Sequence, residues 1–228
     1  MLTKPNTIVT LLFNSEVTIV SKSNSIGKRA ILVALFAAFV CAGCFIQIPL
    51  AGGVPIVIQD MMAMLSGLIL GPLYGTLSVL IFLILGSFGL PVFSGKGGFD
   101  KILSGPTGGF LVGYLFAALA GGLIVHFFVK SPWKQVSPEN ADSSSESAEF
   151  SAKTNALNWI FFGIAAIVAT VVCFALGIAG FHRVKPDLEM SKVLSYVLIP
   201  FIPGNIIKLI IMIPLAKKLY PIVKNYLA

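Results

Sequence analysis

The chain has 228 residues, of which 57% are hydrophobic and only 11% are charged. A soluble domain carries roughly 25% charged residues, so this chain has too few charges to cover a surface in water. The composition therefore excludes an ordinary soluble protein and predicts that lipid surrounds most of the chain. The net charge of +7 is expected to reflect membrane orientation rather than nucleic-acid binding, because no basic helix or aromatic-basic motif is visible.

The first 29 residues are expected to form a cytoplasmic extension. Their apolar stretch, 7–20, is interrupted by Asn14, Ser15 and Glu16. It is also shorter than the roughly 20 residues that a spanning helix needs. No small-residue cleavage site follows it, so a signal peptide is not indicated.

Six apolar stretches follow, and each predicts a membrane-spanning helix. The last apolar run starts near residue 193, but Pro200, Pro203 and Gly204 interrupt it, so its spanning part is expected to begin near Asn205. The pattern predicts an all-α membrane protein whose six-transmembrane-helix bundle occupies 30–220. The expected spans are 30–48, 55–71, 74–88, 108–129, 157–180 and 205–219.

The predicted bundle carries a long connection, 131–156, and a short tail, 221–228. The connection is rich in Ser, Glu, Asp and Asn, which predicts a flexible cytoplasmic insert. Ten lysines and arginines fall in the N-terminal segment and in or next to this connection and the tail, and five fall in the loops on the other side. The N and C termini are therefore both expected to be cytoplasmic. The larger group is Lys4, Lys22, Lys28, Arg29, Lys130, Lys134, Lys153, Lys217, Lys218 and Lys224; the smaller is Lys96, Lys101, Arg183, Lys185 and Lys192.

Small residues recur every four positions on two of the predicted helices. Such a stripe lies on one helix face and lets another backbone approach closely. On the fourth helix we expect it to pack within the bundle, whereas the first-helix stripe suits either the bundle or a partner subunit. The stripes are Ala30, Ala34, Ala38 and Ala42 on the first helix, and Gly105, Gly109, Gly113, Ala117 and Gly121 leading into the fourth.

Apart from Lys217 and Lys218 at the cytoplasmic end of the last span, the lysines, arginines and acids within the predicted spans are Asp60 and Lys208. Charged side chains inside a bilayer are costly and are functional candidates by default. Gln59 adjoins the acid, and Asn205 precedes the lysine by about one turn, near the expected N-cap of the last helix. Free N–H groups beside an ammonium suit an anion or a carbonyl-rich polar ring. A structural Asp60–Lys208 ion pair and a snorkelling Lys208 are the alternatives.

Sequence features favour a transport protein over an enzyme. Cys41 and Cys44 form a C-x-x-C, but with Cys173 they lie in apolar runs and are expected to be packing residues. His126 and His182 fall at opposite ends of the bundle, so they do not form one metal site. No nucleophile motif or phosphate-binding loop is present, and ATP would be hydrolysed by another chain.

Five strings of residues resemble the BioY family, the biotin-specific substrate-capture (S) subunits of energy-coupling-factor (ECF) transporters. The resemblance covers roughly 30–130 and 155–220. The strings are IPLAGGVPIVIQ (48–59), LILGP (68–72), GLPVFSG (89–95), GPTGGF (105–110) and PFIPGNIIK (200–208).

The resemblance implies a six-helix bundle of the S-component type, with a biotin pocket near the outer face and the loop between the third and fourth helices as its lid. The family's last motif has an acid after Pro-Gly, followed by a lysine; here Asn205 replaces the acid and Lys208 is kept. Lys96 is the candidate partner of the biotin carboxylate. No cofactor or metal is implied. The expected substrate-binding residues are Gln59, Asp60, Phe93, Ser94, Lys96, Asn205 and Lys208.

The family's partners imply that a transmembrane coupling subunit and two ATPase subunits work with this chain. Ala30, Ala34 and Ala38 match the small-residue face that contacts the coupling subunit. The expected function is biotin capture for uptake by a multi-pass protein of the bacterial inner membrane, without nucleic acid. The alternatives are an S component for another small vitamin, a membrane-embedded enzyme acting on a lipid-like substrate, and a structural membrane protein.

Overall fold

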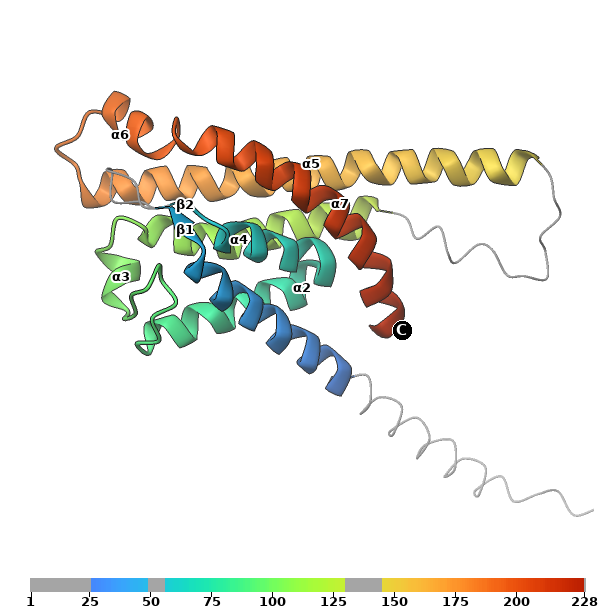
Figure 1. Cartoon of the computed structure of the whole chain (residues 1–228), viewed down its shortest axis with the longest axis horizontal. Coiled ribbons are helices and arrows are strands. Elements are labelled where there is room, and N and C mark those ends of the chain that lie inside the picture. The colour runs from blue at the N-terminus through green and yellow to red at the C-terminus, as the bar shows by residue number, and fades with distance from the viewer. Residues whose placement is uncertain (1–25, 49–55, 130–144, 228) are drawn as a thin grey trace, which may run out of the picture.

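The structure is a computed structural model that describes residues 26–48, 56–129 and 145–227. The predicted N-terminal extension up to residue 25, the motif residues 49–55 and the insert residues 130–144 lie outside this range. Several long helices run along the length of the molecule, the first and the last described helices slant across it, and two short strands lie just before the second helix (Figure 1). The elements are the N-terminal helix Ile26–Phe45 ending in the 3-10 turn Gly43–Phe45, β1 Gln47–Ile48, β2 Ile56–Val57, α2 Gln59–Ser87, α3 Asp100–Leu103, α4 Gly108–Phe128, α5 Ser145–Val184, α6 Met190–Val197 and α7 Phe201–Leu227.

Within the described residues, four helices are long and apolar enough to cross a membrane. They are Ile26–Phe45, Gln59–Ser87, Gly108–Phe128 and Ala156–Val184. The helices α6 and α7 meet at an angle of 46° and add a fifth crossing if they are counted as one broken span. The predicted helical membrane architecture is therefore confirmed, with four to five candidate spans by length and composition among the described residues, where the sequence predicts six.

The difference lies in α2, which reverses direction at Gly71. This glycine has φ 81° and ψ −179°, a conformation that an L side chain rarely adopts. The Oγ of Ser66 donates a hydrogen bond to the carbonyl of Gly75 at 3.1 Å, although residues nine apart in a straight helix are separated by about 13.5 Å. The second and third predicted spans are thus the two arms of one hairpin (Figure 1). The arms are roughly 18 and 24 Å long at 1.5 Å per residue, shorter than a bilayer core of about 30 Å.

Glycines bring α4 into backbone contact with the helices on either side of it. A Cβ added at Gly67 of α2 would lie 2.1 Å from the carbonyl oxygen of Ala118 of α4. A Cβ added at Gly109 of α4 would lie 2.7 Å from the Cα of Gly180 of α5. The small residues of the fourth predicted helix therefore pack inside the bundle, as expected.

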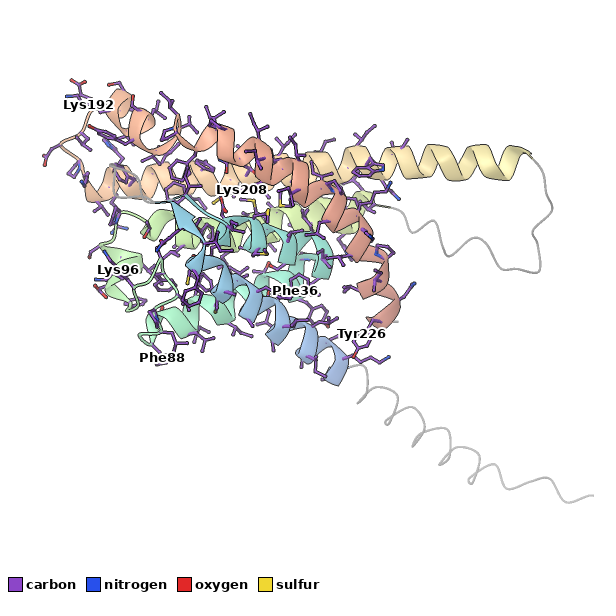
Figure 2. All side chains as sticks on the ribbon, viewed as in Figure 1. Phe36, Phe88, Lys96, Lys192, Lys208 and Tyr226 are labelled. Atoms are coloured by element: carbon purple, nitrogen blue, oxygen red, sulfur yellow. The ribbon has the colours of Figure 1, made fainter. Side chains whose placement is uncertain are left out.

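Both ends of the described chain lie at the same end of the bundle. The ammonium of Lys28 is 5.3 Å from the centre of the Tyr226 ring, so the start of the N-terminal helix meets the end of α7. The guanidinium of Arg29 donates to the hydroxyl of Tyr74 at 3.0 Å, just after the reversal of α2. Figure 2 shows Tyr226 far from Lys96, which lies at the opposite end.

Two sequence expectations about helix boundaries need correction. The second part of the expected flexible insert, from Ser145, is helical and extends α5, because Glu, Ala and Lys favour a helix and extending a helix needs no new nucleus. The helix expected to begin near Asn205 begins at Phe201. Pro203 is tolerated in the first turn because an N–H there has no helical partner to lose. Asn205 is therefore inside α7 rather than at its N-cap.

Replacing Gly180 by alanine is expected to destabilise the protein. The new Cβ would lie 2.4 Å from the Cα of Gly109, and such overpacking costs about 1–3 kcal/mol. Gly163, on the same helix, has no heavy atom within 4 Å of an added Cβ, so Gly163→Ala should be neutral or stabilise by up to about 1 kcal/mol. Thermal unfolding in detergent measures both variants. A Gly180→Ala protein that unfolds at the wild-type temperature would contradict this packing.

Candidate functional site

A cavity opens among the first turn of α2, the 89–98 loop, α4, α5 and the start of α7. Its free volume is about 20 Å³, close to the room that one water molecule needs. A ligand larger than that must move some of the lining. The lining residues are Val57, Gln59, Asp60, Phe93, Ser94, Thr107, Phe110, Leu111, Tyr114, Phe174 and Phe201.

Aromatic rings from three helices form one wall of the cavity. The ring centre of Phe110 on α4 is 5.5 Å from that of Phe174 on α5 and 6.4 Å from that of Phe201 on α7. The rings of Phe174 and Phe201 are 5.8 Å apart. Such a wall suits the apolar face of a ring-shaped ligand.

The carboxylate of one charged pair lines the same cavity as these rings. The ammonium of Lys208 on α7 donates to both carboxylate oxygens of Asp60 on α2, each at 2.8 Å. The side chains are 12% and 9% exposed. The backbone N–H of Met61 donates to the same carboxylate at 2.7 Å. These bonds offset part of the cost of removing the carboxylate from water.

The pair explains how Lys208 has a carboxylate partner although Asn205 stands where the resemblance implies an acid. The acid comes from the start of α2 instead, 148 residues away in sequence. The ion pair that the sequence left as one of several alternatives is therefore present. Lys208 is not in the cavity wall and reaches it through Asp60.

Gln59 lies beside the pair, and its amide holds neighbouring backbone. The side chain is 1% exposed, and its Nε2 donates to the carbonyl of Val40 at 3.1 Å and to that of Val92 at 2.8 Å. It therefore links the start of α2 to the N-terminal helix and to the 89–98 loop.

The 89–98 loop presents some expected site residues to the cavity and others to solvent. Backbone bonds between Phe93 and Lys96, at 2.8 and 3.1 Å, close a tight turn in which Ser94 and Gly95 have φ of 51° and 78°, as in a hairpin turn of type I′. The ring of Phe93 packs 5.4 Å from that of Phe82. Phe93 and Ser94 thus line the cavity, whereas the side chain of Lys96 is exposed.

Four of the seven expected substrate-binding residues line one cavity: Gln59, Asp60, Phe93 and Ser94. Sequence reasoning missed the aromatic residues of α4, α5 and α7, since which face of a uniformly apolar helix points inward is not visible in its pattern. In the part of the chain that the structure describes, no three His, Cys, Asp or Glu side chains lie close enough to hold a metal ion.

The alanine stripe lies on an exposed face of the N-terminal helix and does not line the cavity. Ala30, Ala34 and Ala38 are all exposed, next to the exposed side chains of Ile31 and Phe39. The stripe is therefore not used in packing among the described helices.

Comparison with known proteins identifies sequences similar to this chain. A model of the BioY family matches residues 15–225. A biotin transporter BioY of Rhodobacter capsulatus is 34% identical over 193 residues, which are 81% of this chain and 88% of the relative. The biotin transporter BioY of Thermotoga maritima is 30% identical over 192 residues, which are 84% of this chain and 95% of that relative.

A solved structure has the same fold. It is the S-component for biotin from an ECF-type ABC transporter, with a TM-score of 0.66 and 28% sequence identity, over 86% of this chain and 92% of the other. The family match covers almost the whole chain, and the two relatives align along most of their length. This multi-pass membrane protein therefore belongs to the BioY family.

Proposed function

We propose that this chain is the biotin-capture S component of an ECF transporter in a bacterial inner membrane, a transport protein rather than an enzyme. Relatives that carry the name biotin transporter align over 88% and 95% of their own lengths, which supports the assignment. The observation that carries it is the cavity, whose lining combines the carboxylate of a buried ion pair, Asp60, with three aromatic rings from separate helices.

The chemistry of biotin fits this cavity. Its ureido ring offers two N–H donors and one carbonyl acceptor. The Asp60 carboxylate accepts from the N–H groups. The Lys208 ammonium has three N–H donors, of which two go to Asp60; the third would meet the carbonyl once the lining moves to admit the ligand. The aromatic wall of Phe110, Phe174 and Phe201 then covers the apolar face of the fused rings.

The proposal includes six membrane crossings over 30–220. They are the N-terminal helix, the two short arms of α2, around which the bilayer would have to thin, α4, α5 and the α6–α7 pair. The contact between Lys28 and Tyr226 supports an even number of crossings, because it brings both ends of the bundle together. Ten of the lysines and arginines assigned to the two sides fall on the side of the termini, so both termini are cytoplasmic, as are the extension 1–29 and the tail 221–228.

The exposed stripe of Ala30, Ala34 and Ala38 is proposed as the contact with a transmembrane coupling subunit. Small side chains there allow a partner helix to approach closely within the lipid. Two cytoplasmic ATPase subunits would supply the energy for uptake.

Equilibrium titration of the purified chain tests the function. A site that scavenges a vitamin should bind biotin with a dissociation constant below about 1 μM, or roughly 8 kcal/mol. Thiamine and riboflavin serve as controls and should bind at least about a hundredfold more weakly. Weaker than micromolar binding of biotin, or tighter binding of another vitamin, would contradict the assignment.

Neutralising the ion pair tests whether Asp60 and Lys208 contact the ligand or only stabilise the fold. Lys208→Met or Asp60→Asn alone leaves one buried charge unpaired and should destabilise the protein by about 3–5 kcal/mol. The double variant removes both charges and should unfold near the wild-type temperature. All three should bind biotin at least about a hundredfold more weakly, since each hydrogen bond to a charged group is worth about 1.5–3 kcal/mol. A double variant that binds biotin normally would make the pair purely structural.

Replacing Lys96 by alanine tests the proposed carboxylate contact. Biotin binding should weaken about tenfold or more, because a charge-assisted bond is lost. Biotin methyl ester, which lacks the carboxylate charge, should bind the variant and the wild type equally. Lys192, an exposed lysine at the same end of the bundle (Figure 2), provides the control variant Lys192→Ala. If Lys96→Ala weakened the binding of biotin and of its methyl ester by the same factor, Lys96 would not contact the carboxylate.

A further inference from the structure

Gln59 was expected to contact the ligand, but both protons of its amide are already used. A carboxamide has two N–H donors. Those of Gln59 go to the carbonyls of Val40 and Val92, at 3.1 and 2.8 Å. To donate to a ligand, the amide would have to release one of these carbonyls.

The 89–98 loop is a compact unit attached by its two ends. A Cβ added at Gly97 would lie 2.4 Å from the carbonyl oxygens of both Gly89 and Leu90, so the start and end of the loop touch. The N–H of Gly98 bonds to the carbonyl of Gly86 at 2.8 Å. Gly89 and Gly98 have φ of 102° and 113°, and such glycines are suited to absorbing the backbone rotation of a hinge.

Between these ends, two side chains of the described residues bond the loop to the bundle. The thiol of Cys44 lies 3.7 Å from the carbonyl of Pro91 and is a weak donor. The amide of Gln59 makes the shorter bond, to the carbonyl of the next residue, Val92. Val92 is 6% exposed, so without Gln59 its carbonyl would be buried with no donor while the loop is closed.

The closed loop leaves no room for a ligand of biotin's size. Phe93 and Ser94 of the loop form part of the cavity wall, and the free volume is about 20 Å³. If the loop moved away from the bundle, the cavity would grow on the side where Gln59 bonds to the loop.

We propose that Gln59 is a positioning residue, the latch that holds the 89–98 loop closed over the cavity, and that release of its bond to Val92 opens the ligand's path. The inference uses the proposed function only in taking biotin as the probe. The state of the loop without ligand is a separate readout, so failure of biotin to bind the wild type would not affect it.

Hydrogen exchange of the ligand-free protein, followed by mass spectrometry, tests the latch. Gln59→Met keeps the size of the side chain and removes both donors. Amides of the 89–98 loop should exchange about tenfold faster, the effect of one buried hydrogen bond, and biotin should associate and dissociate faster in stopped-flow measurements. The control is Ser66→Ala, which removes a buried hydroxyl that bonds the carbonyls of Ala63 and Gly75 in the same helix; it should leave exchange in the loop unchanged.

The other outcomes contradict the latch. Unchanged exchange with faster dissociation alone would make Gln59 a ligand contact, and faster exchange throughout the bundle would make it a general packing residue. A second variant needs no change at Gln59: Cys44→Ala removes the weaker bond, to the carbonyl of Pro91. It should speed exchange in the loop less than Gln59→Met does, because a thiol is a weak donor. Equal or faster exchange in Cys44→Ala would overturn Gln59 as the latch.

Discussion

The ion pair between Asp60 and Lys208 is the interaction on which the site depends. Taking two charges out of water costs several kcal/mol per ion, and inside a bundle surrounded by lipid the pair must offset this itself. Two bonds of 2.8 Å and the N–H of Met61 do so. Because the partners come from α2 and α7, the pair also fixes how the last helix meets the rest of the bundle. The Asp60 side chain of this pair also lines the cavity.

The rest of the fold brings that carboxylate to the right place. Gly71 lets α2 turn back on itself, so Asp60 sits at the tip of a short arm, at the end of the bundle opposite the termini. Gly67 and Gly109 allow α4 to touch both α2 and α5 along their backbones. This close packing carries Phe110, Phe174 and Phe201 to one wall. The glycine contacts therefore align the helices, and the Asp60–Lys208 pair joins α2 to α7 at the cavity.

The sequence predicted the chemistry of the site better than its geometry. Asp60 and Lys208 stand out because a charge in an apolar run is costly wherever the helix lies. That they pair with each other is only one alternative from the sequence, because pairing depends on a contact between residues 148 positions apart. Asn205 lies inside α7 and not at its N-cap, because a helix tolerates proline, here Pro203, in its first turn. The aromatic wall was missed, since a helix that is apolar all round hides its inward face.

A structure of the biotin complex tests the central claim most directly. The account predicts that the ureido ring lies within hydrogen-bond distance of the Asp60 carboxylate, about 2.7–3.2 Å, with Lys208 still paired to that carboxylate and the aromatic wall against the fused rings. A complex in which the ureido ring bonds to Asn205 and leaves the Asp60–Lys208 pair untouched would contradict it.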